Sequence, residues 1–136
     1  MFSYIYGHNQ FSNAMSLFAE NEYATYHIQE DILFITYKKG IVINLATAIQ
    51  IVEDRLSLQE GLSYPVLCDI REVRCIDKAA RDYLAVEGSL LIDSVAYLVE
   101  PTVSKTISEF YIHINTPAVA SKNFTDVEAA KAFLRR

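Results

Sequence analysis

The chain has 136 residues, of which 51% are hydrophobic and 21% are charged, and its formal net charge is −5. This length predicts one domain that buries about two-thirds of its unfolded surface, and the composition argues against a long disordered tail. Proteins usually meet a phosphate backbone with a basic surface, so the negative charge predicts no binding to nucleic acid.

The chain lacks the signals of export or membrane insertion. Two cysteines, Cys68 and Cys75, are too few for a disulfide framework, which favours a reducing compartment. The N-terminal residues lack the basic start and continuous apolar run of a signal peptide, and no run approaches the roughly 18 to 20 apolar residues of a membrane-spanning helix. We therefore expect a soluble, cytoplasmic protein without membrane insertion.

Residues 1–22 are an N-terminal appendage in this interpretation, and residues 23–136 form the domain. Four apolar positions of the appendage share one short helical stripe. Its aromatic side chains pack either on their own domain or on a second copy of the chain, and the second alternative predicts a homodimer. The stripe is formed by Phe11, Ala14, Met15 and Phe18, and the aromatic residues are Phe2, Tyr4, Tyr6, Phe11 and Phe18.

Residues 23–42 alternate between apolar and polar positions, as β-strands do. A polar break at residues 29–31 divides them into a hairpin. A second break or a bulge at residues 38–40 precedes residues 41–43, which continue the strand pattern.

A helix is expected next, because Asn44 is a favourable N-cap and Gly61 a favourable end. Its apolar stripe predicts the face that packs on the core, while Glu53, Asp54 and Arg55 are expected near the solvent side. The stripe consists of Leu45, Ile49, Val52 and Leu56.

The stretch over residues 64–87 organises the rest of the domain. Residues 66–70 form a short apolar run, typical of a strand covered on both faces, with Asp69 close to its carboxyl end. A charged loop follows, and Asp77 is a favourable N-cap for the next helix. The apolar positions of that helix are Ala80, Tyr83 and Leu84.

The C-terminal part alternates strands and helices. Residues 95–99 are expected to form a strand, residues 103–115 a helix, and residues 118–121 the last strand. Thr125 and Glu128 match the S/T-x-x-E capping box, which predicts the start of the final helix. The inward positions of the final helix are Val127, Ala130 and Leu134.

This alternation implies right-handed crossovers and a parallel core. The predicted fold class is α/β. A hairpin leads into a mixed sheet of four or five strands, and about four helices pack on that sheet.

The order of these elements resembles the STAS domain, the SpoIIAA-like fold of anti-sigma-factor antagonists and of the cytoplasmic domain of sulfate transporters. The resemblance is sharpest at LCDIREVRCIDKAARDYL, where an apolar strand ends in Asp69 and an apolar residue plus Asp77 lead into a helix. It covers residues 23–136, and the C-terminal FTDVEAAKAFL looks like the closing helix of this and related lipid-binding folds. The resemblance implies the fold and a habit of binding proteins.

One departure from the family concerns regulation. Regulated antagonists usually carry Ser or Thr directly after the Asp at the helix start, where a kinase adds phosphate. This sequence has Lys78 and Ala79 there, and neither offers a hydroxyl group. A phosphorylation switch is therefore unavailable at these two positions.

Charged residues crowd the loop and the first turns of the same helix. A helix N-terminus with guanidinium groups can hold an anion, and open parallel sheets bind ligands beyond the carboxyl ends of their strands. Three alternatives stay open: a mixed-charge surface with intramolecular pairs, a contact surface for a protein partner, and an anion site. The candidate contact residues for a partner or an anion are Asp69, Arg71, Arg74, Asp77, Lys78 and Arg81.

Other chemistry has little support in the sequence. The three histidines lack metal-ligand spacing, Cys68 lies in a core strand, and nothing places a base beside Cys75. No glycine-rich phosphate motif occurs. We therefore expect no metal, no cofactor and no enzymatic activity.

Two functions follow as hypotheses. The leading one is a non-enzymatic protein-interaction module that resembles anti-sigma-factor antagonists, lacks their phosphorylatable hydroxyl and contacts an unknown partner through residues 69–83. The alternative is a small-ligand or lipid-binding domain of SpoIIAA-like fold, which the bulky apolar residues of 103–115 suggest. A closed apolar cavity would favour ligand binding, and a flat exposed patch would favour a partner. A cleft whose residues have strongly shifted pKa values would instead favour an enzyme, which needs convergent titratable groups in a pocket.

Overall fold

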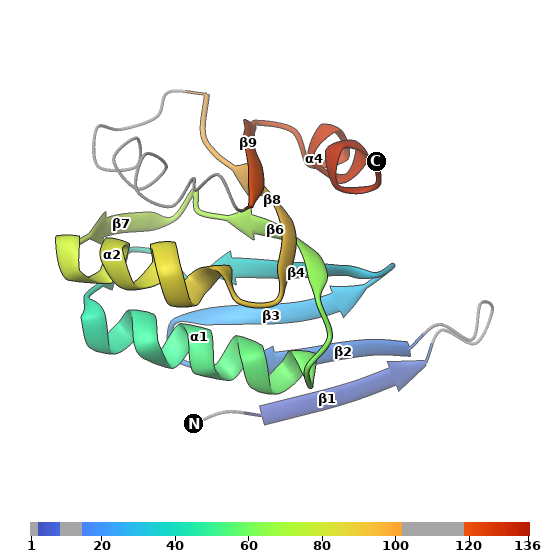
Figure 1. Ribbon diagram of the computed structural model, residues 1–136, viewed down its shortest axis with the longest axis horizontal. Coiled ribbons are helices and arrows are strands. Elements are labelled where there is room, and N and C mark those ends of the chain that lie inside the picture. The colour runs from blue at the N-terminus through green and yellow to red at the C-terminus, as the bar shows by residue number, and fades with distance from the viewer. Residues whose placement is uncertain (1–2, 9–14, 102–118) are drawn as a thin grey trace.

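The computed structural model describes residues 3–8, 15–101 and 119–136. These ranges contain nine strands, three α-helices and one short 3-10 helix (Figure 1). Their bounds are β1 Ser3–His8, β2 Met15–Glu20, β3 Ala24–Gln29, β4 Ile32–Tyr37, β5 Ile41–Ile43, α1 Leu45–Gln59, β6 Tyr64–Asp69, β7 Val73–Ile76, α2 Lys78–Val86, η1 Glu87–Ser89, β8 Ile92–Leu98, β9 Ala120–Phe124 and α4 Val127–Leu134.

Seven of the described strands form one mixed sheet in the order β1-β2-β3-β4-β6-β8-β9. Neighbouring strands are antiparallel from β1 to β4 and parallel from β4 to β9. Strands β5 and β7 form a separate parallel pair. The predicted hairpin is β3–β4 and the predicted parallel core is confirmed, but the prediction of four or five strands is too low.

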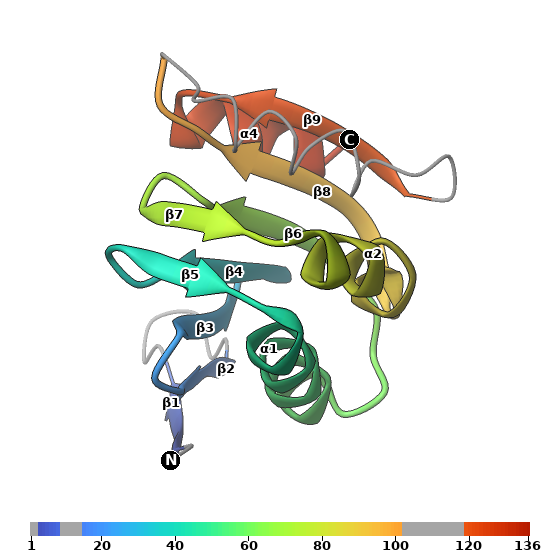
Figure 2. The ribbon, with the colours of Figure 1, turned by 90° about the vertical axis from the view of Figure 1, so that its left-hand side faces the viewer.

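Helices cover both faces of the sheet: α1 and α2 lie on one face and α4 on the other (Figure 2). The core under α1 and α2 includes Tyr26, Ile51 and Val66, and the core under α4 includes Leu67 and Ala130. Neighbouring residues of β6 thus face opposite cores. This explains why the sequence of β6 is apolar at nearly every position rather than alternating.

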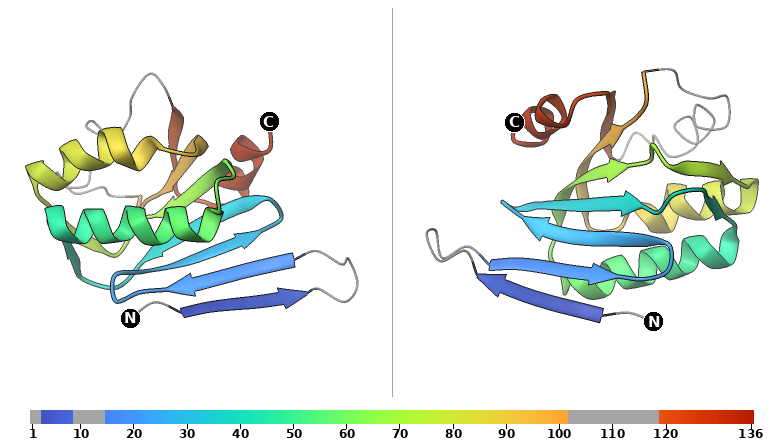
Figure 3. Two further views of the ribbon diagram at one scale, coloured as in Figure 1. Left: turned by 60° about the horizontal axis from the view of Figure 1, so that its bottom comes forward. Right: turned by 180° about the vertical axis from the view of Figure 1, so that it is seen from behind.

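The sheet begins with a hairpin formed by β1 and β2, which Figure 3 shows beside β3 at one edge. Met15 and Phe18 lie in β2, so the helical stripe predicted through them is wrong. A stripe of four residues is too short to separate a helix from a strand. In β2 the fully buried Ala19 pairs with Tyr26 of β3, which fixes the strand against the domain.

Two of the helix starts follow the sequence prediction. The side chain of Asn44 accepts a hydrogen bond from the backbone N–H of Thr47, and Asp77 accepts one from Ala80, each at 2.9 Å. These bonds satisfy backbone donors that the first turn of a helix leaves unpaired.

The N-cap of α4 differs from the prediction. Asp126, rather than Thr125 of the capping box, accepts from the backbone N–H of Ala129 at 2.8 Å. The helix therefore begins at Val127, whose side chain is 38% exposed rather than inward. Ala130 and Leu134 are buried, as the periodicity predicts.

The face of α1 that packs on the core matches the predicted one only in part: Val52 is buried and Leu56 packs against the core. Leu45 is 41% exposed, whereas Asp54 and Arg55, expected near solvent, are 8% and 2% exposed. Both charged side chains find polar partners inside the protein, and these partners offset part of the cost of removing them from water.

Three further predictions concern loops and the C-terminal half. The charged loop expected after β6 contains β7, in which Val73 and Ile76 are buried. The helix predicted over residues 103–115 lies outside the described residues. The last strand is Ala120–Phe124, which begins two residues later than predicted.

No helix within the described ranges is long and apolar enough to cross a membrane.

Candidate functional site

The six predicted contact residues lie at the end of β6, along β7 and in the first turns of α2. Arg71 donates hydrogen bonds from Nε and Nη2 to the two carboxylate oxygens of Asp69, at 3.0 and 2.8 Å. The contact raises the pKa of Arg71, because the neighbouring carboxylate favours the charged guanidinium. The charges of Asp69 and Arg71 therefore pair with each other.

Three more of the six predicted contact residues, Asp77, Lys78 and Arg81, also interact with neighbouring residues of the chain. Asp77 caps α2, and Lys78 pairs with Asp82 one turn further along the helix at 2.7 Å. Arg81 donates from Nη1 to the backbone carbonyl of Ile76 at 3.0 Å. These interactions hold the start of α2 in place against β7.

Arg74 is the exception among the six. Its side chain is exposed, and it forms no ion pair with any residue that the structure describes. Apart from Arg74, the predicted contact residues thus have partners in the same chain.

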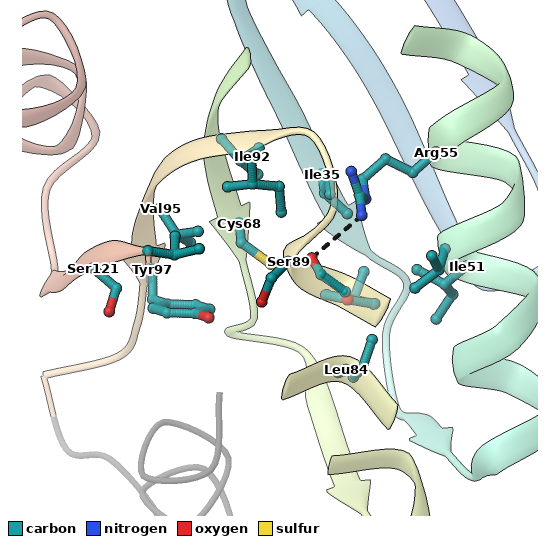
Figure 4. Close-up of a pocket in the computed structure, with 15 residues that line it drawn as sticks. Ile35, Ile51, Arg55, Cys68, Leu84, Ser89, Ile92, Val95, Tyr97 and Ser121 are labelled. Carbon is teal, nitrogen blue, oxygen red and sulfur yellow. Dashed lines mark hydrogen bonds between the residues drawn. The ribbon is translucent and has the colours of Figure 1, made fainter. Parts of the chain in front are cut away.

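A separate feature is a pocket of about 50 Å³ between the sheet and its covering helices (Figure 4). Its walls come from α1, from the end of α2 with η1, and from β4, β6, β8 and the start of β9. None of the six predicted contact residues lines it. The lining residues are Ile35, Tyr37, Ile51, Val52, Arg55, Val66, Cys68, Leu84, Gly88, Ser89, Ile92, Val95, Tyr97, Val119 and Ser121.

Arg55 is the charged residue of this wall, and Figure 4 shows its side chain reaching from α1 toward the pocket. Its guanidinium donates from Nη1 to the side-chain oxygen of Gln59 and, at 2.9 Å, to the carbonyl of Leu90. Nη2 donates to the carbonyl of Gly88 at 3.2 Å. Burial lowers the pKa of Arg55, since the charged form is taken out of water.

The partners of Arg55 are all neutral. Among the described residues, no carboxylate lies within ion-pair distance of its guanidinium. The acidic neighbour on α1, Asp54, is occupied elsewhere: it accepts from Asn21 Nδ2 at 2.6 Å and from Gln50 Nε2 at 2.9 Å.

Two other ionisable groups of the pocket wall stay uncharged near neutral pH. Burial raises the pKa of the Cys68 thiol to about 12. Burial also raises the pKa of the Tyr37 hydroxyl well above its ordinary value. The described lining contains no other ionisable side chain except Tyr97, a phenol, so the described part of the pocket wall carries one positive charge at pH 7.

Sequence reasoning missed this pocket because its residues come from seven separate elements. The one local signal was the spacing of Arg55 and Gln59, four residues apart on α1. That spacing is equally common on the solvent face of a helix, where such a pair is unremarkable. Burial of Arg55 depends on the loop carbonyls of Gly88 and Leu90, which no pattern within α1 reveals.

The mixed sheet with helices on both faces defines an α/β domain. The structure is similar to the crystal structure of an uncharacterized protein from the DUF3478 family, with a SpoIIAA-like fold, from Shewanella loihica PV-4. The TM-score is 0.53 at 14% sequence identity, and the likeness covers 98% of this chain and 93% of that one. At this identity the likeness shows the fold alone.

Residues 26–136 match the family described as "Domain of unknown function (DUF7793)", and the chain belongs to this family. No curated protein matches the sequence. The predicted SpoIIAA-like fold is therefore supported, whereas membership of the anti-sigma-factor antagonists is not shown.

Proposed function

We propose that this protein is a non-enzymatic, cytoplasmic binding module whose internal pocket holds a small ligand. The observation that carries the proposal is a largely apolar pocket with one buried cation, Arg55, in its wall. Pockets of this composition, in which a few polar groups converge among apolar side chains, are the usual ligand sites of proteins.

The size of the pocket limits what it holds. One water molecule needs roughly 10–15 Å³ of such space, so a cavity of about 50 Å³ has room for a few non-hydrogen atoms. It suits a small molecule, or the end group of a longer one. The half-exposed residues Gly88, Ser89 and Ile92 mark where a longer ligand would leave the pocket.

Binding without catalysis is the better proposal for this wall. Catalysis would require a nucleophile or a general base that is poised near neutral pH. Cys68 and Tyr37 keep their protons there, and the described lining residues include no histidine, aspartate or glutamate. What remains is a rigid guanidinium with hydroxyl groups among apolar side chains.

The test is a titration with small probes followed by methyl NMR. Butyrate, butanamide and 1-butanol are added in turn, and at least one should shift the methyl signals of Ile35, Ile51 and Val95. The methyl signals of Leu67 and Leu98, which face the opposite core, serve as the internal control. If no probe shifts the pocket signals, the proposal is wrong.

A filling variant sharpens the test. Val95→Phe places a larger side chain in the pocket wall and should abolish the response to every probe. Val127→Phe, at the exposed start of α4, is the matched control and should respond as the parent chain does. Equal responses from the two variants would show that the probes bind elsewhere.

The second candidate function is the protein-interaction module. The observation that favours it is the exposed Arg74 in β7, which has no ion-pair partner among the described residues. Affinity capture should recover a protein with the parent chain and lose it with Arg74→Glu. Lys131→Glu on α4 is the control, and equal recovery with Arg74→Glu would contradict this role.

We also propose a homodimer, in which β1 pairs with β1 of a second copy. Among the described strands, β1 has one neighbour and so forms an edge of the sheet. Its sequence, SYIYGH, contains none of the charged residues or prolines that discourage pairing at an edge. Antiparallel pairing of identical strands is compatible with two-fold symmetry, the commonest symmetry of oligomers.

A further inference from the structure

We infer that the ligand of the pocket is a short-chain monocarboxylate whose carboxylate binds the guanidinium of Arg55. The inference rests on the proposed function and adds the chemical class of the ligand. It follows from the charge of the wall, the donors that Arg55 keeps available and the absence of a second cation among the described lining residues.

The first step concerns charge. Arg55 is 2% exposed, and an arginine cannot lose its proton at physiological pH, so a permanent cation is buried here. A buried charge is costly unless it is paired, and carbonyl oxygens compensate it only in part. The lining thiol of Cys68 and phenol of Tyr37 do not supply the missing anion, because both remain protonated. A bound anion would complete the pair.

The second step concerns geometry. A guanidinium has five N–H donors, and described residues accept from three of those of Arg55. The Nε–H and one hydrogen on Nη2 donate to no described group. Nε and Nη2 lie on the same edge of the guanidinium, the arrangement that forms two parallel bonds with a carboxylate. The carbonyls of Gly88 and Leu90 and the side chain of Gln59 hold the guanidinium in place.

The third step separates a carboxylate from a phosphate. The described lining has no lysine, no histidine and no second arginine, so one negative charge balances the wall. A phosphate dianion would leave a net negative charge inside the protein, which is unfavourable for the same reason that an unpaired cation is. The lining side chains Ile51, Val66 and Val95 offer apolar surface to a short hydrocarbon tail.

The test compares butyrate with butanamide, which has the same shape and no charge, by calorimetric titration of the full chain. Butyrate should bind about tenfold tighter or more, since a charge-assisted pair distinguishes the two probes. In the NMR spectrum, butyrate should shift the Nε–H signal of Arg55. Inorganic phosphate should leave that signal unchanged.

Two variants test whether Arg55 is the residue that binds the carboxylate. Arg55→Gln should lose the preference for butyrate over butanamide, and Arg74→Gln, at an exposed arginine, should keep it. Arg55→Gln also removes the bonds to Gly88 and Leu90 and could fail to fold. In that case the comparison of the two probes on the parent chain, with the Nε–H signal, decides the question.

The outcomes separate the inference from the proposed function. If butanamide binds as tightly as butyrate, the pocket binds small ligands but the carboxylate inference is overturned. If phosphate moves the Arg55 signal and butyrate does not, the inference is also overturned. If none of the probes binds, both the inference and the proposed function fail.

Discussion

Cys68 and Tyr37 lie together in the pocket wall, and both hold their protons more tightly in the folded chain than in the unfolded chain. Above pH 9, the ordinary pKa of a thiol, the unfolded chain loses a proton that folded Cys68 keeps until about pH 12. Ionisation therefore favours the unfolded state as the pH rises. We expect the free energy of unfolding to be highest below pH 9 and to fall as the pH approaches 12, as measured by urea titrations.

The variant Cys68→Ala separates the contribution of the thiol to this pH dependence from the contribution of Tyr37. It should be less stable below pH 9, because it leaves a small cavity, but its free energy of unfolding should decrease less steeply as the pH rises further. A parent chain whose stability is equal at pH 8 and pH 11 would contradict the buried, protonated state of both groups.

Residue-level predictions from the sequence succeeded where the cause was local. Asp77 caps α2 and Cys68 is buried in a strand, because an N-cap and an apolar run depend on neighbours in the chain. Arg55 was expected near solvent, and the reason for its burial lies more than thirty residues away, at the carbonyls of Gly88 and Leu90. The candidate pocket could not be predicted for this reason.

At the scale of elements, the N-caps of α2 and α4 provide a matched test. Asp77→Ala and Asp126→Ala should each lower the free energy of unfolding by about 0.5–2 kcal/mol, because each removes a hydrogen bond to the first turn of a helix. Denaturant titration measures the change.

Thr125→Ala is the control for α4. The capping box assigns the cap to Thr125, whereas the structure assigns it to Asp126, so Thr125→Ala should cost less than about 0.5 kcal/mol. A larger loss from Thr125→Ala than from Asp126→Ala would show that the box prediction was right.

Element positions were more predictable than the faces they bury. The sequence located α1 between Asn44 and Gly61, and Gly61 does adopt a left-handed conformation, with φ of 81°. The buried face was predicted only in part, because Leu45 is exposed and the polar side chains of Asp54 and Arg55 are buried. Strand β7 was missed because exposed charges around Val73 and Ile76 resemble a loop when the pairing with β5 is unknown.

At the scale of the whole molecule, the alternation of strands and helices was enough to predict the parallel core. It did not predict the extent of the sheet, because the pairing of β1 and β2 with β3 is tertiary information. The sheet runs without interruption from residues 15–20 into β3, so deletion of residues 1–22 would remove β2 along with β1.

The proposed homodimer is therefore tested by a shorter deletion. Removal of residues 1–8 takes away β1 and leaves β2 in place. Light scattering should give twice the chain mass for the full chain and the monomer mass for the shortened chain, with circular dichroism to verify that the shortened chain is folded. A full chain that stays monomeric when concentrated would contradict the proposal.

The central claim is that the pocket beside Arg55 binds a small ligand through a guanidinium that has no ion-pair partner among the described residues. The most direct measurement is a crystal structure of the full chain grown with saturating butyrate. The expected result is electron density in the pocket, with both carboxylate oxygens within hydrogen-bond distance of Nε and Nη2 of Arg55. An empty pocket, or butyrate bound only at the surface, would contradict the claim.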